Sequence, residues 1–216
     1  MMINGLEAGI IEIALFFYIA NYSYNCFNFD TIPKYIFFWL AFTVLTGIYE
    51  LAYICNHKKS IQISKNFLKN KTNVWYSEYN LSIIIPTTLS IKFYGEYGAH
   101  ADREYMTKKD YWSLLIEGSH CLFCGSFALI ALTSFHNNQK DQYYLTVALS
   151  MGTQLMNSIL YMGEYFIQVK TKTSINYNSK SFPSGILLID RPFMYINIFW
   201  TLMPILILNH YIKILS

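Results

Sequence analysis

Five segments of this chain are each apolar over a length that could cross a lipid bilayer. The hydrocarbon layer is about 30 Å thick, and an α-helix needs roughly 20 residues to cross it. The segments are Gly9–Phe27, Tyr35–Cys55, Tyr111–Phe135, Gln142–Val169 and Phe193–Ile214. This pattern predicts an all-α membrane protein, a five-transmembrane-helix bundle in which residues 1–216 form a single domain.

The composition supports a membrane protein. Hydrophobic residues make up 54% of the 216 residues and charged residues only 13%, whereas soluble domains carry about a quarter charged residues. Aromatic residues, at 18%, suit helix ends that lie at the level of the lipid headgroups. The formal net charge of +3 comes without a basic recognition motif, so we expect no nucleic-acid partner.

A long polar connection, Asn56–Asp110, separates the second and third predicted spans. Its first half is rich in lysine and asparagine, and we expect the run Lys58–Lys71 to bury little apolar area. Its second half is apolar but contains Pro86 and is too short to span, so we expect it at the interface or packed against the bundle.

The basic residues are distributed unevenly between the two sides of the predicted bundle. They gather in this connection and in the one before the last span, which places both, with the N-terminus, on the cytosolic or matrix side. The first lysine or arginine is Lys34, so the N-terminus lacks the basic region of a signal peptide. The first span is therefore expected to be retained.

Several polar residues fall inside the predicted spans, where they cost free energy unless they face the bundle interior. They are Thr46 and Glu50 on the second span, Glu117 and His120 on the third, Gln154, Asn157, Tyr161 and Glu164 on the fourth, and Asn197 and Trp200 on the fifth. Spacings of three and four residues place each group on one helix face. We expect these faces to enclose one pocket that suits a largely apolar ligand.

Each of these residues also has a purely structural interpretation. Glu117 is either paired with His120 or Asn197, or it is a functional acid or proton relay. Asn197 alone could join two helices by a hydrogen bond, and Trp200 alone could be packing. The pair Cys121 and Cys124 lacks a second pair at metal-binding spacing, so we predict neither a metal nor a cofactor.

Several stretches resemble the emopamil-binding proteins, a five-span family of sterol Δ8–Δ7 isomerases related to the sigma-2 receptor. They are EYGAHADREYMTKKDYWSLLIEGSHCLF, SMGTQLMNSILYMGE and YINIFWTLMPILIL, with a looser likeness in FWLAFTVLTGIYELAY. The likeness covers most of the chain from Tyr35 to His210. It implies a five-helix fold and a membrane lipid or sterol as ligand.

The resemblance also implies roles for particular residues. Glu50, Glu117, Asn197 and Trp200 fall on positions that the family uses in its active site. In two places this chain differs, because the family histidine one turn before the second-helix glutamate is Thr46 here, and the family threonine one turn after the third-helix glutamate is His120. The list of expected site residues is catalytic Glu50, Glu117 and His120 with substrate-binding Thr46, Asn197, Trp200 and Tyr161.

The family reaction explains why such residues are useful. Moving a sterol double bond from Δ8 to Δ7 requires a proton delivered to C9, a transient cation at C8 and a proton removed from C7. A buried carboxylic acid such as Glu117 can donate the proton, and the indole of Trp200 can stabilise the cation. Asn197 could hold a carboxyl in orientation, and a second acid–base group must accept the outgoing proton.

Three functions stay open at this point. The first is an active sterol isomerase in the endoplasmic reticulum membrane. The second is a non-catalytic relative that binds a sterol or another lipid. The third is a structural subunit of a larger membrane complex, possible also in the mitochondrial inner membrane, in which the lysine-rich connection contacts other proteins; a homodimer is a further assembly to consider.

Overall fold

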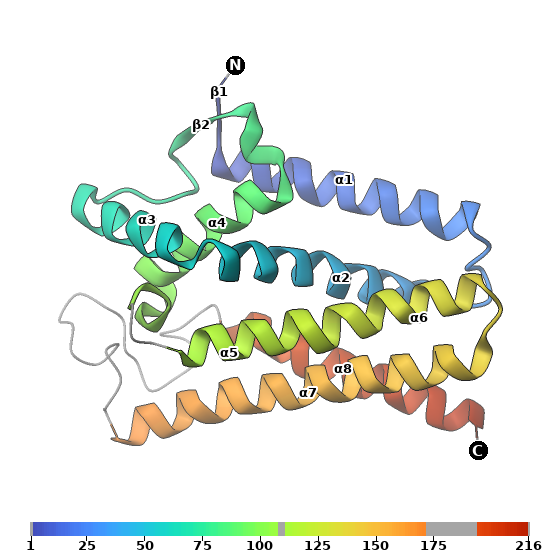
Figure 1. The fold of residues 1–216 in the computed structure, drawn as a ribbon. Coiled ribbons are helices and arrows are strands. Elements are labelled where there is room, and N and C mark those ends of the chain that lie inside the picture. Colours follow the sequence, from blue (N-terminus) through green and yellow to red (C-terminus); the bar gives the residue numbers. More distant parts are fainter. Residues whose placement is uncertain (1, 108–110, 172–193, 216) are drawn as a thin grey trace.

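Helices make up most of the protein (Figure 1). The computed structural model describes residues 2–107, 111–171 and 194–215. The long helices are α1 (Gly5–Cys26), α2 (Lys34–Cys55), α7 (Lys140–Thr171) and α8 (Met194–Leu215), together with the continuous segment α5 (Trp112–Ser119), η4 (His120–Gly125) and α6 (Ser126–His136). Phe193, and most of the predicted connection before it, lie outside the described residues.

Four of these segments are long and apolar enough to cross a membrane, which agrees with an all-α membrane protein. They are Gly5–Cys26, Lys34–Cys55, Trp112–His136 and Tyr195–Ile214. The sequence analysis predicted five spans, and the helix α7 is not among the four. Five spans are therefore not established by length and hydropathy alone.

The helix α7 has an unusual distribution of side chains that explains this difference. Thr146, Ser150, Gln154 and Ser158 recur every fourth residue and are all buried. On the outer surface of the same helix lie large apolar side chains that are exposed, namely Leu145, Leu149, Met156, Ile159 and Leu160. Because the polar side chains face inward, they lower the mean hydropathy of a helix whose outer surface is apolar.

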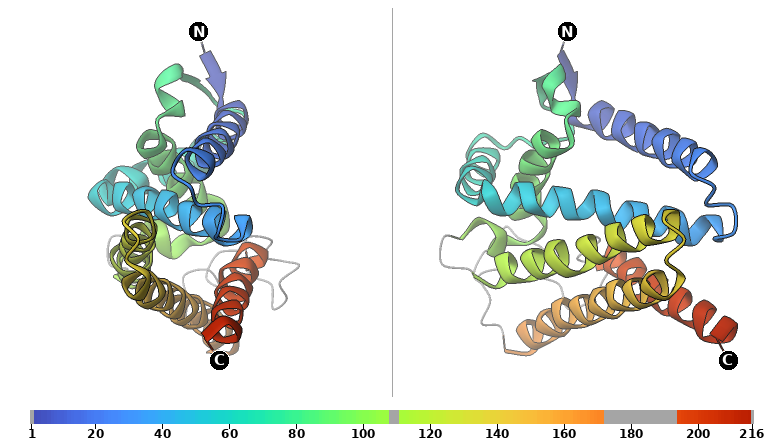
Figure 2. Two further views of the ribbon diagram at one scale, coloured as in Figure 1. Left: turned by 90° about the vertical axis from the view of Figure 1, so that its right-hand side faces the viewer. Right: turned by 45° about the vertical axis from the view of Figure 1, so that its right-hand side comes forward.

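The helices α2, α6, α7 and α8 pack together, and α1 lies apart from them along much of its length (Figure 2). The main apolar core forms where the C-terminal end of α1 meets these four helices. Its most deeply buried members are Ile36, Leu40, Ala128, Ala131, Met151 and Ile207. The arrangement leaves the N-terminal half of α1 supported mainly by the polar connection.

The connection after α2 is folded. It contains α3 (His57–Asn70), β2 (Glu78–Asn80), η1 (Leu81–Ile84), α4 (Pro86–Glu96), η2 (Tyr97–Ala101) and η3 (Arg103–Met106). The strand β1 (Met2–Asn4) pairs antiparallel with β2 and joins the N-terminus to this unit. An Asn4–Glu7 capping box then starts α1.

The second half of the connection packs against the bundle, one of the two placements expected from the sequence. Ser90 of α4 donates a hydrogen bond of 2.5 Å to the carbonyl of Tyr49 in α2. The expectation that Lys58–Lys71 buries little apolar area is wrong, because Ile61, Ile63 and Phe67 of α3 are at most 9% exposed. The lysines occupy only the outer face of an amphipathic helix.

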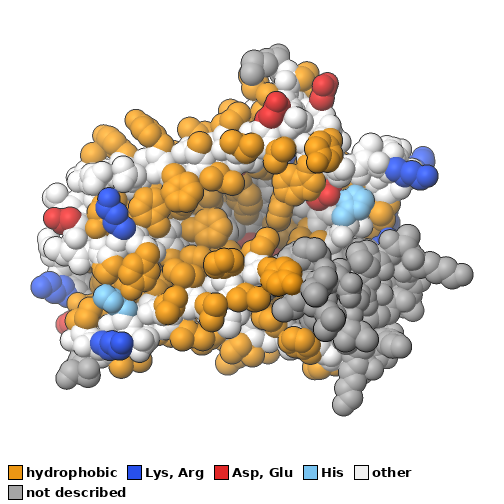
Figure 3. Space-filling view, turned by 180° about the vertical axis from the view of Figure 1, so that it is seen from behind, with side chains coloured by type: hydrophobic (Ala, Val, Ile, Leu, Met, Phe, Trp, Pro, Cys, Tyr) orange, Lys and Arg blue, Asp and Glu red, His pale blue; other side chains and the backbone are white. Residues whose placement is uncertain are grey.

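The surface is divided along the direction of the long helices. Hydrophobic side chains cover the middle of the face shown in Figure 3, and the charged side chains gather toward the two ends of the helices. Among the described residues, isoleucines, leucines and phenylalanines are often more than half exposed, for example Ile13 at 60% and Phe199 at 64%. An apolar band between two charged ends is what a membrane-spanning protein presents to lipid.

Candidate functional site

The helices α2 and η4 meet at a point where both carry glycine. A Cβ atom at Gly47 would lie 3.3 Å from the Cα of Gly125, and the reverse distance is also 3.3 Å. Glycine lets the two backbones come this close, as small residues do between helices in membranes. The segment η4 is a π-helical turn inside a longer helix, a feature that is frequent at functional sites.

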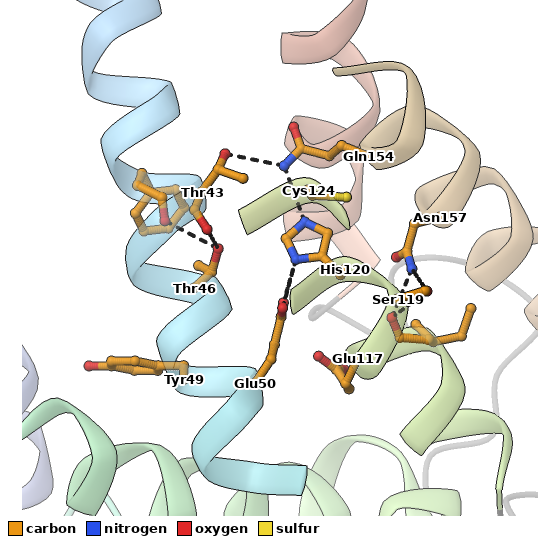
Figure 4. A network of polar contacts seen from close by, with 12 residues as sticks. Thr43, Thr46, Tyr49, Glu50, Glu117, Ser119, His120, Cys124, Gln154 and Asn157 are labelled. Carbon is orange, nitrogen blue, oxygen red and sulfur yellow. Dashed lines mark hydrogen bonds and ion pairs between the residues drawn. The ribbon is translucent and has the colours of Figure 1, made fainter. Parts of the chain in front are cut away.

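This close approach brings Glu50 of α2 opposite His120 of η4. The imidazole Nδ1 lies 2.6 Å from Oε1 and 2.8 Å from Oε2 of the carboxyl group. Both residues are buried, each 6% exposed. The two predicted catalytic residues on different helices are thus direct partners (Figure 4).

A glutamine on α7 determines which nitrogen of His120 carries the proton. The indole nitrogen of Trp39 donates a hydrogen bond of 2.8 Å to Oε1 of Gln154, so the amide NH₂ of Gln154 must point the other way. That NH₂ lies 3.2 Å from Nε2 of His120 and 3.3 Å from the hydroxyl of Thr43. The Nε2 atom therefore accepts, and Nδ1–H donates to Glu50.

The indole of Trp200 lies beside this pair. Its ring centroid is 5.0 Å from that of His120, with the rings nearly perpendicular at 82°. The other neighbours are Phe42, stacked at 5.5 Å and 16°, and Trp39 at 5.0 Å. Trp200 thus joins α8 to the Glu50–His120 pair through an aromatic cluster.

Glu117 is held by two tyrosines of the folded connection. Tyr94 of α4 donates a hydrogen bond of 2.7 Å to Oε2, and Tyr105 of η3 donates one of 2.5 Å to Oε1. Figure 4 shows the carboxyl of Glu117 beside Glu50 and His120. The site therefore contains two neighbouring acid–base centres, one at the first residue of the π-helical turn and one a helical turn before it.

The two tyrosines act as donors because they stay neutral. Burial raises the pKa of both Tyr94 and Tyr105 well above its usual value, and the charge of Glu117 raises it further. Tyr94 is fixed in place by stacking on Tyr53 of α2 at 4.2 Å. The sequence analysis assigned neither tyrosine to the site. Tyr94 belongs to the apolar second half of the connection, whereas Tyr105 directly follows the charged residues Asp102, Arg103 and Glu104.

Tyr161, predicted to bind substrate, lies in a polar cluster next to these tyrosines. Its hydroxyl donates to Asp102 over 3.1 Å and lies 2.7 Å from the hydroxyl of Tyr97. The ring of Tyr97 packs edge-on against Tyr105 at 4.8 Å. Tyr161 is thus linked to Glu117 through Tyr97 and Tyr105, at the end of the bundle that the connection covers.

Asn157, from the predicted polar stripe on α7, supports the start of the π-helical turn. Its amide donates to the carbonyl of Ile116 over 2.8 Å and to the hydroxyl of Ser119 over 2.9 Å (Figure 4). Ser119 directly precedes His120 and Ile116 lies one helical turn before it, so the contact helps to orient the imidazole. The three polar residues of α7 therefore contact different parts of the site. Gln154 contacts His120, Asn157 contacts the backbone and Ser119 before it, and Tyr161 contacts Asp102 and Tyr97.

Two predicted site residues make other contacts. The hydroxyl of Thr46 donates to carbonyl groups of its own helix, at 3.1 Å to Phe42 and 3.0 Å to Thr43. The backbone carbonyl of Asn197 accepts from Thr201 over 2.9 Å, and none of the hydrogen bonds found among the described residues joins its side-chain amide to a carboxyl of the site. The expected orienting role of Asn197 therefore has no contact that supports it.

The cysteines and the possible metal ligands form no further site. Cys124 is fully buried, with its Sγ 3.5 Å from the hydroxyl of Thr153, as expected for a packing residue. In the part of the chain that the structure describes, no three His, Cys, Asp or Glu side chains are grouped so that they could hold a metal ion. The side chains described at the site present carboxyl, imidazole, phenol and indole groups.

Comparisons with known proteins give no neighbour for this chain: no family model, no curated protein and no solved structure matches it.

Proposed function

We propose that this protein is an intramembrane isomerase that moves a double bond in a sterol-like lipid by proton transfer. The observation that carries the proposal is the pair of adjacent acid–base centres, Glu50 with His120 and Glu117 with its two tyrosines. Such a pair supplies what a double-bond shift requires, one group to deliver a proton and another to remove one. The resemblance to the sterol isomerase family supports the same reaction.

In this proposal α7 is a fifth membrane span. Its outer surface carries exposed leucine, isoleucine and methionine side chains, and its polar side chains face the site. Its 32 residues are more than the roughly 20 that a span requires. The bundle then encloses the site on the α7 side without exposing Gln154 or Asn157 to lipid.

Glu117 is the proton donor in the proposed mechanism. When its carboxyl is protonated, one of the two phenols turns from donor to acceptor, so the group stays fully hydrogen-bonded in both states. The proton goes to one carbon of the double bond, and positive charge appears on the other. In this proposal the indole of Trp200, which lies beside His120, stabilises this charge.

The Glu50–His120 pair removes the second proton. With Nδ1–H directed at Glu50, the lone pair of Nε2 is the basic site, and the carboxyl stabilises the imidazolium that forms. Because the Gln154 amide covers Nε2 at 3.2 Å, it moves aside when substrate binds. Loss of the adjacent proton from the substrate forms the new double bond, so the substrate gains one proton and loses one. A proton must then pass from His120 back to Glu117 before the next turnover.

The test is conversion of a Δ8 sterol to its Δ7 isomer in membranes that contain the protein and lack their own isomerase. We expect wild-type membranes to convert the sterol. Glu117→Gln and His120→Leu should each lose at least a hundredfold in rate, because neither side chain can then transfer the proton. Glu78→Gln, an exposed carboxyl on β2, is the matched control and should keep full activity. Undiminished conversion by Glu117→Gln would remove Glu117 from the mechanism.

A second function, a non-catalytic lipid-binding or structural subunit, is favoured by one specific observation. Both nitrogens of His120 already have partners within the protein, which is how a purely structural imidazole is held. The outer face of α3 offers a docking surface, the exposed lysines Lys58, Lys59, Lys65 and Lys69. This surface suits acidic proteins or anionic lipid headgroups.

Blue-native gels of membranes in mild detergent distinguish the two functions. A structural subunit should migrate in a large complex that is lost when Lys58, Lys65 and Lys69 are changed to glutamate. Charge reversal is preferable to deletion because α3 buries Ile61 and Phe67. An isomerase should migrate alone or as a homodimer. The family resemblance places the enzyme in the endoplasmic reticulum, whereas a respiratory-complex subunit would be in the mitochondrial inner membrane.

A further inference from the structure

A second candidate site lies in a groove of about 650 Å³ between α1, α2 and α6. None of the residues of the site around Glu50 and Glu117 lines this groove. Its walls are almost entirely apolar, for example Leu15 and Phe16 on α1, Val44 on α2 and Leu132 on α6. The groove exists because α1 lies apart from the other long helices (Figure 2).

One carboxyl group breaks the apolar lining. Glu12 of α1 lines the groove and is 8% exposed. Its Oε1 is buried, and no hydrogen-bond partner for it is found among the described residues. Glu12 lies seven residues into α1, roughly 10 Å along a helix that rises 1.5 Å per residue, so water is not a ready substitute at this depth. A buried polar atom without a partner costs free energy, which a bound donor would offset.

The groove is elongated, and its carboxyl is near one end. Ile84 and Pro86 line it beside the folded connection, and His136 and Asn137 line it at the end of α6. From Glu12 to Phe27, both lining residues, α1 rises roughly 22 Å. A ligand that matches this lining has a long apolar body and a polar group that lies beside Glu12.

We propose that this groove binds a membrane lipid with an elongated apolar body and a hydroxyl head, and that the hydroxyl donates a hydrogen bond to Oε1 of Glu12. The proposal does not depend on the isomerase activity. Two kinds of lipid have this chemistry, sterols and long-chain alcohols, and both enter the experiment.

A hydroxyl fits the groove better than a charged head. No lysine or arginine is among the residues found to line it, and His136 lies at the end of α6, away from Glu12. The groove therefore offers an anionic head no permanent counter-ion near the carboxyl. A cationic amine would have to form an ion pair inside hydrocarbon, where desolvation opposes the Coulombic gain. A hydroxyl both donates and accepts, so it satisfies a carboxyl group in either protonation state without burying a new charge.

Photolabelling of the full chain in phosphatidylcholine nanodiscs tests the proposal. The probes are a sterol and a long-chain alcohol, each with a diazirine on the apolar body, and their methyl ethers, which cannot donate a hydrogen bond. Below saturation we expect at least one alcohol to label groove peptides of α1, α2 or α6 about tenfold more than its ether does. The alcohol that does so shows whether the bound lipid is a sterol or a long-chain alcohol.

Substitutions make the labelling specific. Glu12→Leu should reduce labelling by the alcohol to the level of its ether, and Ala41→Trp should abolish it by filling the groove. Ile13→Trp is the matched control, because Ile13 is 60% exposed on the same helix and does not line the groove. Thermal unfolding of each variant in detergent shows that the protein is folded.

Three results would overturn the proposal. Equal labelling by alcohol and ether would mean that the groove only contacts bilayer tails. Unchanged labelling of Glu12→Leu would mean that its carboxyl is not the acceptor. Displacement of the alcohol by a tenfold lower concentration of the corresponding long-chain amine would mean that the site prefers a cation.

Discussion

Two glutamates of this protein are equally buried in membrane helices and have opposite surroundings. Glu50 on α2 is 6% exposed and contacts Nδ1 of His120. The other ring nitrogen of His120, Nε2, accepts a hydrogen bond from Gln154. Glu12 on α1 is 8% exposed, and its Oε1 has no partner among the described residues. Burial alone therefore does not determine whether a carboxyl group is paired. In this protein the difference is whether a second helix brings a polar side chain within contact distance.

The packing of the helices accounts for this difference. Around Glu50, Gly47 and Gly125 let α2 and η4 approach so closely that His120 reaches the carboxyl. The helix α1 has no such contact near Glu12, and a Cβ placed on Gly9 would meet nothing within 4 Å. Close packing produces a polar network that is satisfied within the protein, whereas the separation of α1 leaves an acceptor for a ligand.

Breaking the Glu50–His120 pair should have the largest effect. We expect His120→Leu to lower the free energy of unfolding by about 3–5 kcal/mol, because it leaves a buried carboxyl without its partner. The double variant Glu50→Leu, His120→Leu should be clearly more stable than His120→Leu alone, since neither member of the pair is left without its partner. Thermal unfolding in one detergent measures both. Thr46→Val is the control and should change stability by less than about 0.5 kcal/mol, because the hydroxyl bonds only its own helix.

Separating the two helices should have the next largest effect. Gly47→Ala places a Cβ atom 3.3 Å from the Cα of Gly125, where backbone rather than a flexible side chain must move. We expect a loss of about 1–3 kcal/mol and a weaker Glu50–His120 contact. Gly152→Ala is the matched control, since its Cβ would meet nothing within 4 Å and the substitution favours the helix. Equal stability of both variants would contradict the tight approach.

Removing the unpaired carboxyl of Glu12 should raise the free energy of unfolding, whereas the two changes above lower it. We expect Glu12→Leu to raise the free energy of unfolding of the lipid-free protein by about 1 kcal/mol, because a buried acceptor without a partner is replaced by an apolar side chain in an apolar groove. The measurement is thermal unfolding in detergent without added lipid alcohol. A loss of stability similar to that of His120→Leu would show that Glu12 has a partner within the protein.

The fold was largely predictable because hydrophobic length determines where a chain can cross a membrane. The four apolar spans lie where the sequence places them to within a few residues. The helix α7 shows the limit of hydropathy, since its buried Ser150 and Gln154 lower the mean hydropathy of a helix that is apolar outside. The connection was the least predictable part. The many lysines of α3 make this amphipathic helix look like a polar loop in the sequence. Its buried apolar residues pack on later parts of the connection, such as Ala99.

The candidate site was predictable only one helix at a time. Helical spacing put Glu117 and His120 on one face of the third span, but it could not show which residues of other helices they meet. The partner of His120 is Glu50, seventy residues earlier, and the partners of Glu117 are Tyr94 and Tyr105 from the connection. In the sequence, Glu12 is simply a carboxyl within the first predicted span, and whether it has a partner follows from tertiary packing alone.

Glu96 is intermediate between Glu50 and Glu12, because it is buried and its partner is a backbone N–H. Its substitution has the smallest effect that we predict. It is buried at the end of α4, outside the spans, and its carboxylate accepts a hydrogen bond of 2.8 Å from the backbone N–H of Val74. Burial raises the pKa of this carboxyl above its ordinary value of 4.5, although the Val74 bond and the charge of His100 act in the opposite direction. The folded protein therefore binds a proton more tightly than the unfolded chain does.

It follows that stability falls as the pH rises from about 4.5 through the folded-state pKa of Glu96. Glu96→Gln keeps an acceptor for Val74 and removes the titration, so we expect it to flatten this part of the pH profile and to gain less than about 1 kcal/mol at neutral pH. Amide hydrogen exchange of Val74, followed across the pH range, is the local measurement. Glu96→Leu is the control, because it leaves the Val74 N–H without an acceptor and should be destabilised at every pH. A wild-type profile in Glu96→Gln would assign the pH dependence to another group.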